Sequence, residues 1–400
     1  MQFRPSRLWL PLAIGILTTA VLPAADTVAT LPFFNQTTNP NLDWIGESVA
    51  ENLRESLAGA GILALSREDR VEVYRRLAVR SGVVLTRATV LRIGESLDAG
   101  QILFGHYELA PAPAGDTNGD TKSRGTLKLT VNIIDAKNLR TGPQFFESGP
   151  LEDLSLLESR LAWQCVYYLR PHSAPPQADF LKARPPVRVE AVEGYIRGLL
   201  AESPEAKQKL FTQSAQIDPQ YSEPAFQLGR MSFDKKSYKT AIDWFRKVAP
   251  SDSHFHEAQF LLGLCRYYNN EMDDAVKVLQ AVAAEVPLNE VFNDLGAAQL
   301  RTNRPEAIEN FKKALEGDQA DPDYWFNLGY AQWKAGQVAD AAKSFREVLA
   351  RVPDDAEARA LLARCEKGDL PHTGETLTAE RIKRTFEETV YLQLQAELKK

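Results

Sequence analysis

The sequence contains few cysteines. Only three occur among 400 residues, at Cys165, Cys265 and Cys365, and such a sparse, odd-numbered set does not form the disulfide framework of a small secreted domain. Cys265 and Cys365 fall at the same position of repeats that lie three units apart, so several helix layers separate them. A disulfide requires Cα atoms within about 7 Å, which this separation exceeds. We therefore predict that all three thiols are buried and behave as small apolar residues.

Histidine is also scarce, and the motifs of common enzymes are missing. None of the five histidines lies in a zinc-protease helix pattern. His254 and His256 are two residues apart at a repeat junction, and residues two apart on a helix point in different directions. We predict that both are solvated loop side chains. The sequence contains no Gly-x-Ser-x-Gly motif, phosphate-binding loop or dinucleotide fingerprint.

One acidic segment partly matches a calcium-binding loop. Asp116–Asp120 offers oxygen atoms at alternate positions, as calcium requires. However, Thr121 stands where the turn glycine belongs, and Leu127 stands where the bidentate acid belongs. A hairpin tip explains the glycine, asparagine and aspartates equally well. We predict no metal, no cofactor and no catalytic residue, and therefore a protein that is not an enzyme.

Charge and composition exclude two further classes. The chain carries 47 Lys and Arg against 53 Asp and Glu, a formal net charge of −6, so it lacks the basic character typical of nucleic-acid-binding proteins. Its content of 44% hydrophobic and 25% charged residues is close to that of soluble folded proteins, which excludes disorder along the whole chain. This length predicts about two or three domains.

The N-terminus has the layout of a secretory signal peptide. Arg4 and Arg7 precede the apolar run Leu8–Leu22, and Ala24 and Ala25 follow it. We predict a signal peptide over residues 1–25, with cleavage after Ala24 or Ala25 left open. The apolar run is shorter than the roughly 20 residues of a membrane span, although an uncleaved anchor is the alternative. No later segment is long and apolar enough to span a bilayer, so export to the bacterial periplasm or cell envelope is expected.

The second half of the chain repeats itself. Leu-Gly pairs recur with spacings of 34, 33 and 33 residues, at Leu228-Gly229, Leu262-Gly263, Leu295-Gly296 and Leu328-Gly329. Downstream, an alanine and a large residue recur four positions apart, as Ala241/Phe245, Ala275/Leu279, Ala307/Phe311 and Ala341/Phe345. This period predicts pairs of antiparallel helices in which glycine and alanine permit close approach and the large residue fills the adjoining gap. Neighbouring pairs must stack, because one pair cannot bury its own apolar face.

This pattern resembles the tetratricopeptide-repeat (TPR) family. The resemblance is strongest at Asp323–Gly329, with Ala341, Phe345 and Pro353 following at the family's spacing. It implies an all-α superhelix, an α-solenoid, over residues 188–367. We place a divergent repeat at 188–221, four repeats at 222–255, 256–288, 289–321 and 322–355, and a truncated repeat from residue 356.

In the TPR family, the first helix of each repeat lines a concave groove that binds a protein or peptide. Carried over by position, the partner-binding groove comprises Phe226, Arg230, Phe233, Phe260, Leu264, Tyr267, Tyr268, Asn293, Arg301, Phe326, Tyr330, Trp333 and Lys334. Aromatic residues and arginine carry much of the binding energy at protein interfaces, although half of this set is expected to pack between helices. Phe226 and Phe260 replace the polar residues of the family's carboxylate clamp. An apolar or aromatic segment is therefore the expected ligand, oriented by Arg230, Arg301 and Lys334.

Residues 26–172 follow a different pattern. Helices connect the first predicted strands, and hairpins connect the later ones. Strands are predicted at 27–34, 62–65, 101–109, 125–135 and 145–146, and helices at 43–57, from 66, at 86–97 and at 151–169. In the strand 125–135, apolar residues alternate with polar ones, which indicates one buried face. The order predicts a small α/β domain with a mixed sheet.

This domain resembles the TolB N-terminal and CsgG/FlgO-like envelope families. The matching segments are Leu31–Asn35, Asp43–Glu47, Asp98–Gly105 and Val131–Thr141. The resemblance implies association with an envelope complex. A proline-rich linker is predicted at residues 173–187.

A last helix is predicted at residues 376–400. Its apolar stripe is spaced by four residues, at Ile382, Phe386, Val390, Leu394 and Leu398. We favour a helix that caps the solenoid, because an uncapped end exposes apolar core. A dimer-forming or partner-binding helix is the alternative.

Together these features predict a non-enzymatic exported scaffold or adaptor that binds a protein or peptide in the TPR groove, in envelope assembly or transport. The first alternative is a component of an outer-membrane export or pore complex, by analogy with CsgG-like proteins. The second, less favoured alternative is an envelope enzyme. The sequence names neither the partner nor the oligomeric state.

Overall fold

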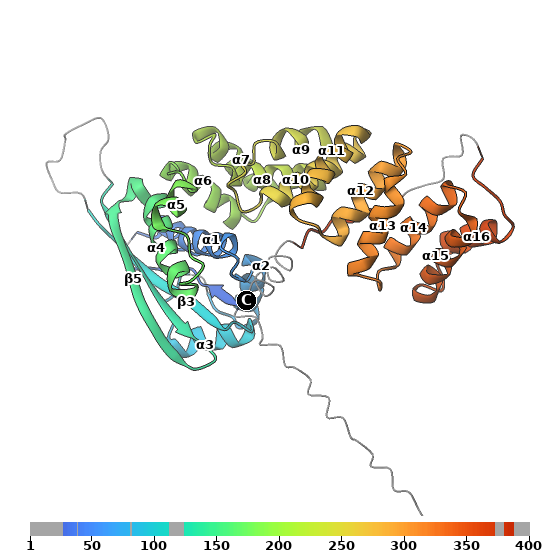
Figure 1. Ribbon diagram of the computed structural model, residues 1–400. Coiled ribbons are helices and arrows are strands. Elements are labelled where there is room, and N and C mark those ends of the chain that lie inside the picture. Colours follow the sequence, from blue (N-terminus) through green and yellow to red (C-terminus); the bar gives the residue numbers. More distant parts are fainter. Residues whose placement is uncertain (1–26, 38, 81, 112–123, 373–379, 388–400) are drawn as a thin grey trace, which may run out of the picture.

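The computed structural model describes residues 27–37, 39–80, 82–111, 124–372 and 380–387. The predicted signal peptide and the calcium-like segment 116–120 lie outside the described residues. The described chain consists of a sheet with helices on it, followed by a curved array of paired helices (Figure 1). No helix in these ranges is both long and apolar enough to cross a membrane.

The N-terminal sheet is mixed, as predicted. Its strands are β1 (Val28–Thr30), β2 (Phe34–Asn35), β3 (Gln101–Ala110), β4 (Thr126–Asp135) and β5 (Arg140–Pro150). The order is β1-β3-β4-β5, and β2 also pairs with β3. Strands β1 and β2 run parallel to β3, whereas β3, β4 and β5 are antiparallel neighbours. The strand predicted at 62–65 is reduced to one parallel bridge between Val28 and Ala64. Its neighbour β1 is only three residues long, and the backbone hydrogen bonds between them all involve Val28.

Helices cover both faces of the sheet. Helices α1 (Trp44–Gly59) and α4 (Leu154–Leu169) pack on one face, and α2 (Arg67–Arg76) and α3 (Arg87–Ser96) pack on the other (Figure 1). Two short 3-10 turns, Pro40–Leu42 and Leu151–Asp153, precede α1 and α4. The alternation of residues in β4 determines which side chains point to each face of the sheet. Leu127, Leu129 and Val131 are fully buried against α1 and α4, while Ile134 lies in the core beneath α2 and α3.

The segment predicted as a proline-rich linker contains helix α5 (Gln177–Lys182). Phe180 in α5 is buried in an apolar core that continues from the sheet to Phe211 and Leu228 in the first repeats. Ser155 of α4 fixes the end of the segment, since its hydroxyl donates to the Val187 carbonyl at 3.1 Å and accepts the Val187 N–H at 2.9 Å. The α/β domain and the start of the solenoid therefore share one core.

The described part of the solenoid consists of five helix pairs and a final single helix. These are α6 (Val189–Leu200) and α7 (Pro204–Ile217), α8 (Glu223–Asp234) and α9 (Tyr238–Phe245), α10 (Phe255–Tyr268) and α11 (Met272–Glu285), α12 (Asn289–Arg301) and α13 (Glu306–Gly317), α14 (Pro322–Lys334) and α15 (Val338–Arg351), and α16 (Ala356–Glu366). Several helix starts carry capping residues, because Ser203 and Asp355 accept backbone N–H groups of the first turns of α7 and α16.

The recurring glycines have the role that the repeat pattern predicts. A Cβ atom added at Gly229 would lie 2.6 Å from the Phe245 ring, and one at Gly263 would lie 2.7 Å from Leu279. The large residue of each second helix therefore occupies the space left by the glycine of the first helix. The three cysteines are buried and unbridged, as expected.

The prediction of a helix at 376–400 is wrong over residues 380–387. This segment, called here the tail segment, is extended and lies against the first helices of the repeats. Ile382 and Phe386, two members of the expected helical stripe, are partly buried against the solenoid core. Side chains of the solenoid bind the backbone of the tail segment and so replace the hydrogen bonds of a helix. The other residues of the predicted helix lie outside the described ranges.

Candidate functional site

The first helices α8, α10, α12 and α14 form one surface, called here the first-helix face, which holds the tail segment. Asn327 of α14 binds the backbone of Arg381 twice, because its Oδ1 accepts the Arg381 N–H at 2.8 Å and its Nδ2 donates to the Arg381 carbonyl at 2.9 Å. In α12, Asp294 Oδ1 accepts the N–H of Lys383 at 3.0 Å. Asn327 and Asp294 each precede a Leu-Gly pair, so they occupy equivalent positions one repeat apart.

Two further side chains extend these backbone contacts. Asn293 Nδ2 also donates to the Arg381 carbonyl, at 2.8 Å, and Glu290 Oε1 accepts the Glu387 N–H at 2.9 Å. Contacts to backbone groups do not depend on the ligand's side chains. This arrangement therefore recognises an extended polypeptide as such, and alternate residues of an extended chain present equivalent backbone groups.

Acidic side chains surround the basic residues of the tail segment. Arg381 forms ion pairs with Asp323 at 3.3 Å and with Asp355 at 2.7 Å. Lys383 Nζ lies 2.6 Å from Asp321 and 2.7 Å from Asp323. Because Asp323 serves both cations, the two basic residues are bound by one connected acidic cluster.

Glu380 is the most deeply buried residue of the tail segment. The hydroxyl of Tyr267 and the Nε of Arg301 both donate to Glu380 Oε2, each at 2.7 Å. Burial raises the pKa of Tyr267, and the Glu380 carboxylate raises it further. The hydroxyl therefore keeps its proton and remains a donor to the carboxylate.

Aromatic rings of the first-helix face contact the same segment. The rings of Phe386 and Phe260 lie 5.3 Å apart between centroids. The guanidinium of Arg381 is 3.7 Å from the Phe326 ring centroid, a distance at which cation–π attraction contributes. Arg384 lies in the same way over Phe233, at 4.7 Å.

Two of the backbone-binding acids have perturbed pKa values. Burial raises the pKa of Asp294 well above its ordinary value, whereas the hydrogen bonds from the Lys383 N–H and the Asn293 amide lower it. Burial also raises the pKa of Glu290, opposed by the N–H of Glu387. The backbone of the tail segment thus stabilises the ionised form of both buried acids.

The structure separates the predicted groove residues into three groups. Six contact the tail segment, namely Phe233, Phe260, Tyr267, Asn293, Arg301 and Phe326. Four are buried in the solenoid core, namely Phe226, Leu264, Tyr330 and Trp333. Three are exposed, namely Arg230, Tyr268 and Lys334. Arg230 and Lys334 lie over rings of their own helices, Phe226 and Tyr330.

Sequence reasoning missed most of the polar contacts. The missed residues are Glu290, Asp294, Asp321, Asp323, Asn327 and Asp355. Asp321 and Asp355 cap helices, and this structural role is sufficient to explain an acid at a helix start. One signal in the sequence could have identified two of them. Asp294 and Asn327 are polar residues that directly precede the Leu-Gly pair in two adjacent repeats.

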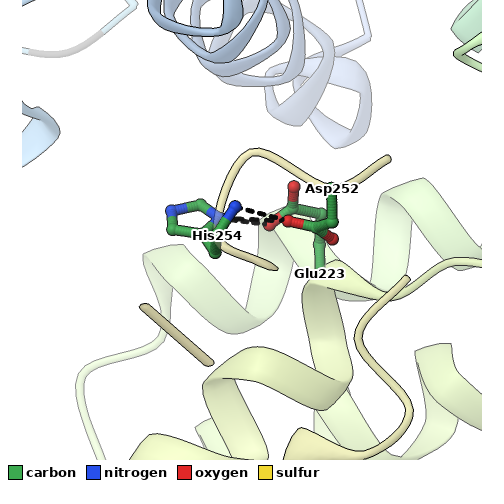
Figure 2. Close-up of side chains that lie close together, drawn as sticks. All are labelled: Glu223, Asp252 and His254. Carbon is green, nitrogen blue, oxygen red and sulfur yellow. Dashed lines mark hydrogen bonds and ion pairs between the residues drawn. The ribbon is translucent and has the colours of Figure 1, made fainter. Parts of the chain in front are cut away.

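A second polar cluster lies where the α/β domain meets the repeats. Figure 2 shows His254 facing the carboxylates of Glu223 and Asp252, with Nδ1 at 3.2 Å and 3.4 Å from them. The His254 ring also stacks on Phe226 at a centroid distance of 4.3 Å. The prediction that His254 is a solvated loop side chain is therefore wrong, because the loop folds back and places the ring on a buried phenylalanine.

The electrostatics of this cluster are those of an ion pair. Burial alone lowers the pKa of His254, but the charge of Glu223 and the hydrogen bonds to both carboxylates outweigh it, so the pKa lies well above the ordinary value. The three side chains place ligand atoms within 4.8 Å of one another, a spacing that a metal ion also requires. A protonated imidazole offsets the charge of one of the two carboxylates.

A cavity of ≈150 Å³ adjoins this cluster and is lined by residues of α1, α4 and α6, by Glu223 at the start of α8 and by the loop that carries Asp252. Glu158 lines it from α4, and burial raises its pKa to about 8. Its Oε1 has no hydrogen-bond partner among the described residues. Burial also raises the pKa of Glu55 well above its ordinary value, and the nearby Glu223 adds to that shift.

Comparison with known families identifies the repeats. Two tetratricopeptide-repeat profiles match the chain, one over residues 257–289 and one over residues 302–365. These matches confirm that the chain contains tetratricopeptide repeats, as the 34-residue period predicts.

Several solved structures are similar to part of the chain. YrrB, described as a TPR protein with an unusual peptide-binding site, is 18% identical, with a TM-score of 0.39 over 44% of this chain and 92% of YrrB. The structure of MamA from residue 41 to its end, from Desulfovibrio magneticus RS-1, is 24% identical, with a TM-score of 0.37 over 40% of this chain and 92% of that chain. A thermophilic TPR protein from Thermus thermophilus is 15% identical, with a TM-score of 0.33 over 44% of this chain and 99% of that protein. The resemblance of residues 26–172 to the TolB and CsgG/FlgO-like families remains a prediction.

Proposed function

We propose that this protein is a non-enzymatic scaffold that binds an extended segment of a partner protein on the first-helix face. The observation that supports this proposal best is that Asn327, Asp294 and Glu290 accept hydrogen bonds from backbone N–H groups of an extended segment. A TPR array is suited to this task because stacked repeats produce a long continuous surface.

The second part of the proposal concerns location. The basic and apolar N-terminal segment and the envelope-family resemblance of residues 26–172 support export to the bacterial periplasm or cell envelope. The α/β domain shares a core with the first repeats, so a partner bound on its sheet would be held rigidly relative to one on the first-helix face. We propose that the protein serves as an adaptor in envelope assembly or transport.

The test is affinity capture of the full chain from bacterial envelope extract, read by mass spectrometry. Asn327→Ala is made in a chain that also carries Arg381→Glu/Lys383→Glu, so that the chain's own tail segment does not respond to the same substitution. It removes two backbone contacts and should reduce partner recovery about tenfold, since a good pair of hydrogen bonds contributes about 1–2 kcal/mol. Asn310→Ala in the same background is the matched control, because Asn310 is also a buried amide, bonded to Gln299, but it lies on the second helix α13.

Partners that persist with Asn310→Ala and are lost with Asn327→Ala would support the proposal. Equal recovery with both variants would contradict it and would move partner binding to another surface. Release of the mature chain by osmotic shock tests the location separately, and retention in the cytosolic fraction would overturn that part.

A further inference from the structure

We propose that the tail segment is an internal competitor for the first-helix face, displaced by partner segments of the same chemistry. This inference rests on the proposed function and adds regulation and ligand chemistry to it. The partner segment would be extended and would carry an acid, then two basic residues two positions apart, and then an aromatic residue.

The position of the tail segment argues against a role as a structural cap. A cap covers the exposed apolar end of a solenoid, which here is the outer side of α16. The tail segment instead lies across several first helices, from Asn327 of α14 to Phe260 of α10 and Asp234 of α8. It occupies the surface on which a ligand would bind and leaves the last helix without a further helix packed on it among the described residues.

The contacts of the tail segment are suited to exchange. Arg384, Thr385 and Glu387 are exposed, and the ion pairs of Arg381 and Lys383 remain partly open to solvent. Solvent reaches these ion pairs in part and screens them, so equivalent charges of another chain can replace them. The backbone of the tail segment is bound by side chains of the solenoid and takes no part in a sheet or helix. Another extended chain can therefore replace it without the unfolding of any other element.

The acids of the first-helix face specify the chemistry of the ligand. Asp321, Asp323 and Asp355 form a negative cluster around the two alternate basic residues. Arg301 and Tyr267 form a separate donor pair for one carboxylate. An acidic segment would meet repulsion at the negative cluster, whereas a segment with the charge order of Glu380–Phe386 satisfies all of these groups.

Attachment to the same chain gives the tail segment an advantage over outside ligands. A segment held in the same molecule competes at an effective concentration of about millimolar. If that concentration is about ten times the dissociation constant of the tail segment for the first-helix face, this face is free in about a tenth of the molecules. An outside segment then binds about tenfold more weakly than it would to a chain whose tail segment is released.

The test measures binding of a fluorescent peptide with the sequence of residues 380–387 to the full chain by anisotropy. Arg381→Glu/Lys383→Glu in the full chain reverses both charges that face the acidic cluster and should release the tail segment. The peptide should bind this variant at least about tenfold more tightly than the native chain. Lys343→Glu/Arg346→Glu is the matched control, since it makes the same charge change on the exposed face of α15.

A second variant guards against an unrelated effect of charge reversal. Phe386→Asp removes the ring that contacts Phe260 and should also tighten peptide binding. A peptide with glutamate at the positions of Arg381 and Lys383 should not bind any of the chains. Unchanged far-UV circular dichroism in each variant would show that the repeats remain folded.

The outcomes separate the two proposals. Equal peptide affinity for the native chain and both release variants would overturn the internal competitor and leave the scaffold function intact. No peptide binding to any chain would overturn both the ligand chemistry and the first-helix face as the binding surface. A native dimer in sedimentation that Arg381→Glu/Lys383→Glu dissociates would show that the tail segment occupies a second copy, which would overturn competition within one chain.

Discussion

The first-helix face and the junction between the α/β domain and the repeats differ in how they hold their contacts. The junction buries Phe180, Phe211 and Leu228 in one apolar core. The first-helix face holds the tail segment mainly through polar side chains that reach its backbone and charges. Apolar burial is strong and hard to replace, whereas polar contacts exchange with an equivalent ligand. The comparison indicates one permanent interface and one interface built for exchange.

The largest expected effect is at the junction. Phe211→Ala should reduce the free energy of unfolding by about 3–5 kcal/mol, because it removes a buried ring that packs against Gly198 and Tyr195. Phe386→Ala, the matched change on the first-helix face, should cost about 1 kcal/mol or less, since that ring is only partly buried. Urea denaturation of both variants tests this. Similar losses would abolish the distinction between the interfaces.

Glu158→Gln should stabilise the protein at alkaline pH. The native carboxyl has a pKa of about 8 in the folded state against the ordinary 4.5, so stability falls as pH rises from about 4.5 to about 8. Glutamine carries no proton to lose, and each pKa unit corresponds to about 1.4 kcal/mol. We expect a gain of up to about 4 kcal/mol at pH 8 and little change at pH 4, measured by urea unfolding. A pH-independent difference would contradict the buried neutral carboxyl.

His254→Gln should have its largest effect at low pH, whereas Glu158→Gln has its largest effect at high pH, because in both cases the native contribution falls as pH rises. The raised pKa of His254 means that the ion pair stabilises the fold fully below pH 6.5, and that this contribution is lost as pH rises through the folded pKa. The variant should lose about 1–3 kcal/mol at pH 6 and approach the native chain at high pH. Thermal unfolding at pH 6 and pH 10 provides the measurement. An equal loss at both values would indicate packing on Phe226 as the main contribution.

The smallest expected effect concerns Asp323 on the first-helix face. Asp323→Asn removes a charge shared by Arg381 and Lys383 but should change global stability by less than about 1 kcal/mol. Hydrogen exchange at the N–H groups of Arg381 and Lys383 should nevertheless become about fivefold faster, because the tail segment opens more often. Asp340→Asn on α15 is the control, since Asp340 pairs with the exposed Lys343. Unchanged exchange would contradict a role for the acidic cluster.

The parts of the fold set by short-range patterns were predictable from sequence. The pairing of Gly263 with Leu279 follows from spacing alone, because the repeat fixes which residues of two adjacent helices meet. The alternation at Leu127 and Leu129 likewise indicates the buried face of β4. In both cases the interacting residues lie on neighbouring elements, so local spacing carries the information.

The tail segment and the His254 cluster depend on distant partners and were missed. Ile382 and Phe386 lie four apart, which matches a helix, but the solenoid offers the backbone hydrogen-bond partners that a helix would otherwise supply internally. His254 meets Glu223 across a repeat boundary, in a loop whose course no periodicity indicates. Six residues that were predicted to line a partner-binding groove contact the tail segment, while the acids that pair with its charges resembled ordinary helix starts.

The surface is sensitive to the spacing of the two basic residues that it binds. Asn327 and Asp294 hold the backbone of Arg381 and Lys383, while Asp321 and Asp323 pair with the side chain of Lys383. A residue inserted between the two basic side chains would turn the second one to the opposite side of an extended chain, away from Asp321. The spacing of the basic residues, as well as their charge, therefore selects the ligand.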